Sequence, residues 1–236
     1  MSLRFAVVGT PGDRRVGLFR DAVVARGFAE PYVIPWADVL TGLDVEAPEG
    51  ALLRIDSPGE DALADALLRG PGHPARVGEG ATWYKAFTAG LDRVAAIPGV
   101  TLLGDVGEIG VMFDKRRCHA VLSGAGVPVP PAFEAGSYAE LRDAMADRGW
   151  ARVFVKPAHG SSASGVIAFQ AHAGRVQAVT SADWVDGVLC NSLRVRTVTG
   201  EGRSGGWWTS WAPTGCTSNG GFPRRRPAAR RSTCGW

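Results

Sequence analysis

The side chains best suited to chemistry lie in one stretch, RVFVKPAHGSSASGVIAF, at residues 152–169. An apolar strand ends there at Lys156, and a run of Gly, Ser and Ala follows before the sequence becomes apolar again. Glycines let backbone N–H groups approach a polyanion closely, and Ser161, Ser162 and Ser164 add hydroxyl donors. A lysine at a buried strand end keeps its charge when an anion pairs with it. The pattern predicts a phosphate site, with a β-hairpin bearing an exposed lysine as the alternative.

The elements next to this loop follow from the hydrophobic pattern and from the prolines. One helix of about five turns is expected over 105–126. Three prolines make 127–133 an extended connector. A capping box formed by Ser137 and Glu140 begins a helix over 137–150. Further strands are expected at 152–157, 166–169 and 188–199.

The first hundred residues alternate between strand and helix. Strands are expected at 3–9, 31–36, 51–55 and 100–104, and helices at 16–28, 61–70 and 81–99. Such alternation is typical of a parallel sheet covered by helices on both faces. The character of the chain changes near residues 105–110, where we expect a domain boundary.

The first strand is followed by Gly9, Gly12 and a helix, which makes a weak dinucleotide fingerprint. The third glycine of G-x-G-x-x-G is missing, because Gly17 falls too late, and no convincing acid ends the second strand. We therefore interpret this loop as structural turn chemistry rather than as a nicotinamide cofactor site.

Two lysine motifs, in this order, carry a family resemblance. The stretch DKRRCHAVLSGAGVPVPPAF at 114–133 opens a helix on D-K and continues in the form G-h-P-h-P. After a short helix, VFVKPAHGSSASGV ends a strand on K-P and enters a loop similar to G-S-x-G-x-G-V. This arrangement resembles the nucleotide-binding core of the ATP-grasp superfamily, in the branch of the ribosomal-protein glutamate ligases and glutathione synthetases, and it covers residues 3 to about 200.

The resemblance implies an α/β and α+β fold, with a Rossmann-like pre-ATP-grasp domain at 1–108 and the N-terminal part of the ATP-grasp domain at 109–202. The composition of the remaining residues predicts an unstructured or frame-shifted tail at 203–236.

The resemblance also implies that the protein binds ATP with magnesium. Lys115 and Lys156 look like the two lysines that reach the phosphates, and the loop from Gly160 to Gly165 looks like the one that closes over them. Ala163 departs from the family pattern, in which glycine is common. The implied ATP-binding residues are Lys115, Lys156, Gly160, Ser161, Ser162, Ser164 and Gly165.

Members of the family use ATP to phosphorylate a carboxylate, and an amine or another nucleophile then attacks the acyl-phosphate. Catalysis of this kind depends on positioning and on charge neutralisation by lysines and magnesium. The magnesium ligands are expected past the end of this chain, so we assign no metal ligand and no catalytic residue. The sequence does not identify the carboxylate or peptide substrate.

The charge of the chain is unevenly distributed. All 23 acidic residues lie at or before Glu201, whereas six of the 26 basic residues follow it, so the net charge of +3 becomes −3 for residues 1–201. A mildly acidic body makes nucleic acid an unlikely partner for the protein as a whole.

Cysteine and histidine usage and the absence of long apolar runs indicate a cytoplasmic protein without zinc. The four cysteines form no C-x-x-C pair and are expected to be reduced, and the four histidines show no spacing typical of metal ligands. No apolar run reaches the roughly 18–20 residues that a membrane helix needs, and the N-terminus reads as a strand rather than a signal peptide.

The composition changes after about residue 203, where the chain contains four of its eight tryptophans and no acid. One hypothesis is a basic aromatic arm that binds nucleic acid, which would make the protein a non-catalytic binding module. The other is a shifted reading frame. Tryptophan has a single codon, TGG, so reading from the third base of Trp207 forces Val-Asp, and permitted codons continue as Glu-Leu-Gly. These residues resemble the ATP-grasp strand that contacts adenine. The frame would then be lost between about Thr199 and Gly206, leaving the protein truncated and inactive or impaired.

Overall fold

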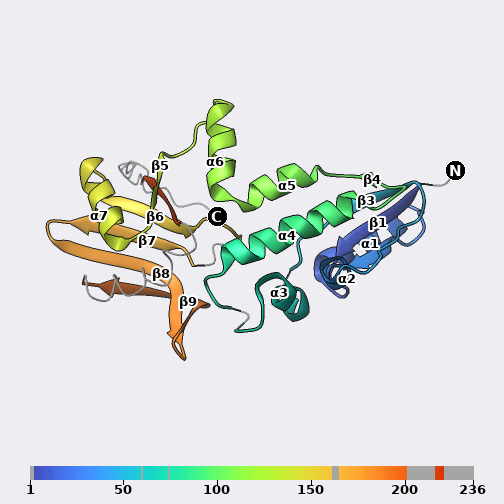
Figure 1. The fold of residues 1–236 in the computed structure, drawn as a ribbon, viewed down its shortest axis with the longest axis horizontal. Helices are drawn as coiled ribbons and strands as arrows, with labels where there is room; N and C mark the ends of the chain where they lie inside the picture. The colour runs from blue at the N-terminus through green and yellow to red at the C-terminus, as the bar shows by residue number, and fades with distance from the viewer. Residues whose placement is uncertain (1–2, 60, 74, 161–164, 201–215, 221–236) are drawn as a thin grey trace, which may run out of the picture.

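A computed structural model describes residues 3–59, 61–73, 75–160, 165–200 and 216–220. These residues form two sheets, which lie toward opposite ends of the elongated molecule, with helix α4 extending from the first toward the second (Figure 1). Among the described residues, no helix is both long enough and apolar enough to cross a membrane.

The first sheet has four parallel strands in the order β2-β1-β3-β4, as the strand–helix alternation predicts. Its strands are β1 (Arg4–Gly9), β2 (Tyr32–Pro35), β3 (Ala51–Ile55) and β4 (Thr101–Leu102). The helices are α1 (Arg14–Val24), α2 (Trp36–Thr41), α3 (Ala62–Arg69) and α4 (Gly80–Ala95). Helix α2 was not predicted, because its six residues are too few to establish a helical period.

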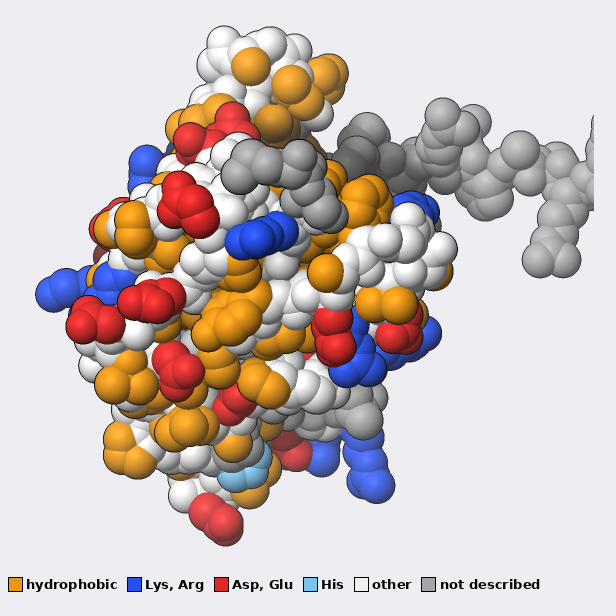
Figure 2. Space-filling view, turned by 90° about the vertical axis from the view of Figure 1, so that its right-hand side faces the viewer, with side chains coloured by type: hydrophobic (Ala, Val, Ile, Leu, Met, Phe, Trp, Pro, Cys, Tyr) orange, Lys and Arg blue, Asp and Glu red, His pale blue; other side chains and the backbone are white. Residues whose placement is uncertain are grey.

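Both faces of this sheet are covered, because successive residues of β1 point to opposite sides. Ala6 and Val8 are fully buried in the core that α2, α3 and α4 form with the sheet, around Trp36 and Phe87. On the other face, Gly9 lets α1 approach closely, since an added Cβ would lie 2.6 Å from Val16 Cγ2. Acidic, basic and hydrophobic side chains are intermingled on the surface at this end of the molecule (Figure 2).

The helix predicted over 105–126 is wrong as a single element. The chain forms α5 (Val106–Phe113) and α6 (Lys115–Gly124), separated by Asp114 in an extended conformation with φ −109° and ψ 105°. The Asp114 carboxylate accepts the backbone N–H groups of Arg116 and Arg117, so it caps α6 and begins a new helix in a new direction. The break places Lys115 at a helix N-terminus.

The second sheet has six strands in the order β5-β10-β6-β7-β8-β9, with antiparallel pairing throughout. Its strands are β5 (Ala132–Ala135), β6 (Arg152–Pro157), β7 (Ile167–His172), β8 (Arg175–Val185), β9 (Val188–Thr199) and β10 (Cys216–Gly220), and the chain between β5 and β6 forms α7 (Tyr138–Asp147). The hairpin expected on either side of the Gly/Ser loop is confirmed as β6 and β7. Strands β8 and β10 were not predicted.

Candidate functional site

Lys115 lies where the start of α6 meets the first residues of the glycine-rich loop. Its backbone N–H donates to the carbonyl of Ala158 at 2.9 Å, and its Nζ donates to the carbonyl of Gly160 at 2.7 Å. The lysine is therefore held at both its main chain and its side-chain tip by the segment that follows β6. This contact joins the two sequence motifs in space.

Lys156 lies near the end of β6 and lines the same pocket as Lys115. The chain contains three lysines, and these are two of them; the third, Lys85, is exposed on α4. The pocket has a volume of about 340 Å³. The sequence predicts that both lysines act on one ligand, and the fold brings them to one cavity.

The rest of this lysine pocket is largely apolar. Met112, Leu122, Val129 and Phe133 contribute to its lining, together with the polar residues Arg116, His119 and Glu134. Arg116 Nη1 lies 3.5 Å from Glu134 Oε2, and His119 Nε2 lies 2.9 Å from the carbonyl oxygen of Pro130. Apolar walls with a few cations suit a ligand that combines an aromatic base with an anionic group.

A second cavity, of about 160 Å³, lies between the loop after β3 and the start of the glycine-rich loop. Ser57 and Gly59 line one side, and His159 and Gly160 line the other. Arg76 also lines this cavity but is only 7% exposed, and its guanidinium is held by Glu79 at 2.6 Å and by three backbone carbonyls. These contacts fix the connection between α3 and α4, so Arg76 serves the fold.

Two titratable groups beside Lys115 have pKa values below their usual ones. Burial lowers the pKa of His159, and the opposing charge of Asp114 only partly offsets that effect. Burial also pulls the pKa of Asp114 upward, but the N–H groups of Arg117 and Arg116 outweigh it and hold that pKa below 3.8. Near neutral pH the pair is therefore a neutral imidazole facing a carboxylate. The sequence-based prediction of the site includes neither Asp114 nor His159, although Asp114 belongs to the D-K motif.

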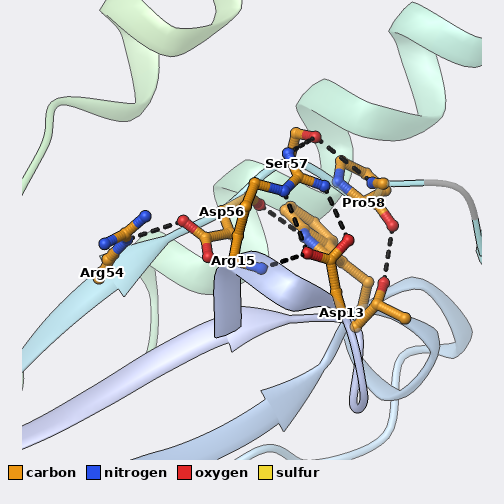
Figure 3. Close-up of polar contacts among 9 residues, drawn as sticks. Asp13, Arg15, Arg54, Asp56, Ser57 and Pro58 are labelled. Carbon is orange, nitrogen blue, oxygen red and sulfur yellow. Dashed lines mark hydrogen bonds and ion pairs between the residues drawn. The ribbon is translucent and has the colours of Figure 1, made fainter. Parts of the chain in front are cut away.

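The loop after β1 makes the contacts of a structural turn (Figure 3). Asp13 caps α1 by accepting the N–H of Arg15, and the guanidinium of Arg15 donates to Asp13 and to Ser57. The hydroxyl of Thr10 donates to the carbonyl of Pro58 at 2.7 Å. These bonds tie the loop after β1 to the loop after β3, in keeping with the structural interpretation of this sequence.

The predicted loop residues are only partly within the described chain. Gly160 and Gly165 both have positive φ, 102° and 67°, a conformation that favours glycine. The N–H of Gly165 donates to Asn191 Oδ1 at 3.4 Å. Ser161, Ser162 and Ser164 lie outside the described residues. The phosphate-binding roles of all seven predicted residues stay predictions.

Within the described ranges, no group of three or more His, Cys, Asp or Glu residues could hold a metal ion. We assign no magnesium ligand among these residues. Most of the tail at 203–236 also lies outside the described residues, β10 excepted.

Comparisons with known proteins give matches among solved structures. No protein-family model and no curated protein matches the chain. A D-cycloserine synthetase, DcsG, is 17% identical with a TM-score of 0.52, over 92% of this chain and 59% of that one. The ATP-grasp ligase PsnB, complexed with a minimal precursor, Mg and ADP, is 16% identical with a TM-score of 0.47, over 93% of this chain and 65% of its own. A RimK-domain ATP-grasp protein from Sphaerobacter thermophilus is 15% identical with a TM-score of 0.42, over 93% of this chain and 65% of its own.

The match to the D-cycloserine synthetase shows a shared fold. This chain shares the mixed α/β fold of that synthetase, with one parallel and one antiparallel sheet, as the sequence predicts, and the solved structures that match it include ATP-grasp ligases. The chain spans 59 to 65% of the length of the three solved structures.

Proposed function

We propose that this chain binds ATP in the pocket that Lys115 and Lys156 line. The observation that carries the proposal is that two of the three lysines in the chain, 41 positions apart in sequence, meet in one cavity with apolar walls. The apolar residues would contact the adenine ring and the two ammonium groups would contact the phosphates. The ammonium group of Lys115 has three N–H donors, so it can contact a phosphate oxygen while it keeps its bond to the carbonyl of Gly160.

The wider activity proposed is that of an ATP-dependent ligase. In that reaction ATP phosphorylates a small carboxylate or a peptide, and an amine or another nucleophile displaces the phosphate. The lysines of this chain would neutralise charge on the phosphates and orient them. We propose that magnesium is held by residues of the remaining length of such a ligase, and that the reaction takes place in the cytoplasm, where ATP is available.

Nucleotide binding can be tested on the chain as it exists. Isothermal titration with adenosine, AMP, ADP and ATP, with and without magnesium, should give affinity that increases from adenosine to ADP, because the lysines act on the phosphates. NAD is the matched control, since it shares the adenosine diphosphate moiety but has no terminal phosphate. Equal affinity for adenosine and ADP, or no binding of either, would contradict the proposal.

We further propose that this chain is impaired in turnover because its coding frame shifts between about Thr199 and Gly206. Sequencing the coding DNA from codon 190 to beyond the stop tests this directly. A second frame that continues as Val-Asp-Glu-Leu-Gly and later encodes acidic metal ligands supports the proposal, and restoring that frame should restore ATP turnover. A second frame that closes at once would overturn it and would make the basic tail, with its proposed nucleic-acid affinity, the segment to test by salt-dependent binding.

A further inference from the structure

The entrance to the glycine-rich loop is fastened to the start of α6 by a short antiparallel bridge. Asp114 and His159 are the bridged residues. The N–H of Lys115 donates to the carbonyl of Ala158, and the N–H of Gly160 donates to the carbonyl of Phe113 at 3.2 Å. Two segments that are about 45 residues apart in sequence, each carrying a predicted phosphate-binding residue, are thus joined through the backbone on both sides of one residue pair.

Side chains reinforce this bridge from a third element, α4. His159 Nε2 lies 3.5 Å from Asp114 Oδ2, and these two side chains are only 8% and 6% exposed. The ring of Tyr84 stacks on the imidazole with centroids 4.5 Å apart, and Arg117 donates to the Tyr84 hydroxyl at 3.2 Å. The other Asp114 oxygen caps α6. One oxygen of Asp114 therefore caps α6, and the other faces His159 at the entrance to the glycine-rich loop.

The Asp114 carboxylate determines which nitrogen of the His159 imidazole carries the proton. Within the described chain, its Nδ1 is buried with no hydrogen-bond partner. A neutral imidazole carries one N–H, and Nε2 is the nitrogen that faces the carboxylate. The tautomer with the proton on Nε2 is therefore favoured, because it keeps the contact with Asp114. The buried Nδ1, which has no hydrogen-bond partner among the described residues, lowers the free energy of unfolding.

We propose that Asp114 and His159 are a positioning pair, which fixes Lys115 Nζ relative to the carbonyl of Gly160 so that the lysine and the loop entrance reach a polyphosphate as one unit. Neither side chain is placed on the nucleotide. The inference rests on the proposed ATP binding, because it assigns the pair a role in that site. The contacts of the pair lie entirely within the chain, so the pair should order Lys115 and Gly160 whether or not a nucleotide is bound.

Two amide substitutions separate positioning from packing. The amide nitrogen of His159→Gln can occupy the place of Nε2 and donate to Asp114, whereas that of His159→Asn matches the place of Nδ1, which has no partner. Both variants lose the stacking on Tyr84 equally. The matched control is His172→Asn, at an exposed histidine at the end of β7.

The first readout is the affinity for ADP relative to adenosine. We expect His159→Asn to weaken ADP binding about tenfold, the effect of one lost hydrogen bond, while leaving adenosine binding unchanged. His159→Gln should stay within about threefold of the parent chain, and His172→Asn should match it. Equal effects of Gln and Asn on ADP binding, or an equal loss of adenosine binding, would overturn the proposal and leave the pair a packing contact.

The second readout needs no nucleotide. Hydrogen exchange resolved by NMR should show the N–H groups of Lys115 and Gly160 exchanging about tenfold faster in His159→Asn than in His159→Gln, with the amides of the β6–β7 ladder unchanged. Unchanged exchange at Lys115 and Gly160 refutes the pair's role even if ATP binding is confirmed. Faster exchange in His159→Asn, together with no nucleotide binding by the parent chain, would support the positioning role of the pair and refute the proposed function.

Discussion

Replacing Lys115 by methionine is the most direct perturbation of the proposed nucleotide site. Methionine keeps an unbranched, apolar side chain in the pocket and removes the ammonium group that donates to the carbonyl of Gly160. A charge-assisted hydrogen bond contributes about 1.5–3 kcal/mol. Since each 1.4 kcal/mol is a factor of ten, we expect ATP to bind about 10- to 150-fold more weakly. The bond to Gly160 is itself charge-assisted, so its loss should also lower the free energy of unfolding by about 1.5–3 kcal/mol.

The assay is isothermal titration of ATP and adenosine into the parent chain, Lys115→Met, Lys156→Met and the double variant. Lys85→Met is the matched control, because Lys85 is exposed on α4 and does not line the pocket. Adenosine affinity should be unchanged in every variant. If Lys115→Met and Lys85→Met bind ATP equally well, or if Lys115→Met weakens adenosine as much as ATP, the reasoning from the pocket is refuted.

Three further predictions concern stability. Gly9→Ala should lower the free energy of unfolding in urea by about 1–3 kcal/mol, because the new Cβ would lie 2.6 Å from Val16 Cγ2; a double-mutant cycle with Val16→Ala should recover part of that loss, and strict additivity would contradict the close approach. Trp36→Phe should cost about 1–3 kcal/mol by the same assay, since its buried indole N–H donates at 2.8 Å to the backbone carbonyl that follows β3; a neutral result would contradict that bond. The melting temperature should fall as the pH decreases below 6.5, because the pKa of His159 is lower in the folded chain and the unfolded chain therefore binds a proton first. His159→Gln should flatten this part of the profile of melting temperature against pH. Identical profiles for the parent chain and the variant would show that His159 is not the titrating group.

The sequence by itself determined the local elements and the two lysine motifs. Hydrophobic periodicity identifies the strands and helices of the first hundred residues and the face of each that is buried. The alternation of these strands and helices predicts the parallel sheet that the structure shows. The β6–β7 hairpin follows from two apolar runs on either side of a Gly/Ser stretch. Lys156 was found because it ends a predicted strand beside the Gly/Ser loop, and Lys115 was found through the resemblance of the D-K motif to the ATP-grasp pattern.

Only the tertiary structure decided how these pieces meet. The helix break at Asp114 is invisible to periodicity, because the residue is held extended by its contacts with a loop 45 positions away. Strand β10 was not predicted because its place between β5 and β6 depends on long-range pairing rather than on its own composition. The shared lysine pocket and the pair of Asp114 and His159 likewise arise from non-local contacts. Local pattern specifies which segments are helix or strand, whereas burial and pairing across distant segments specify the site.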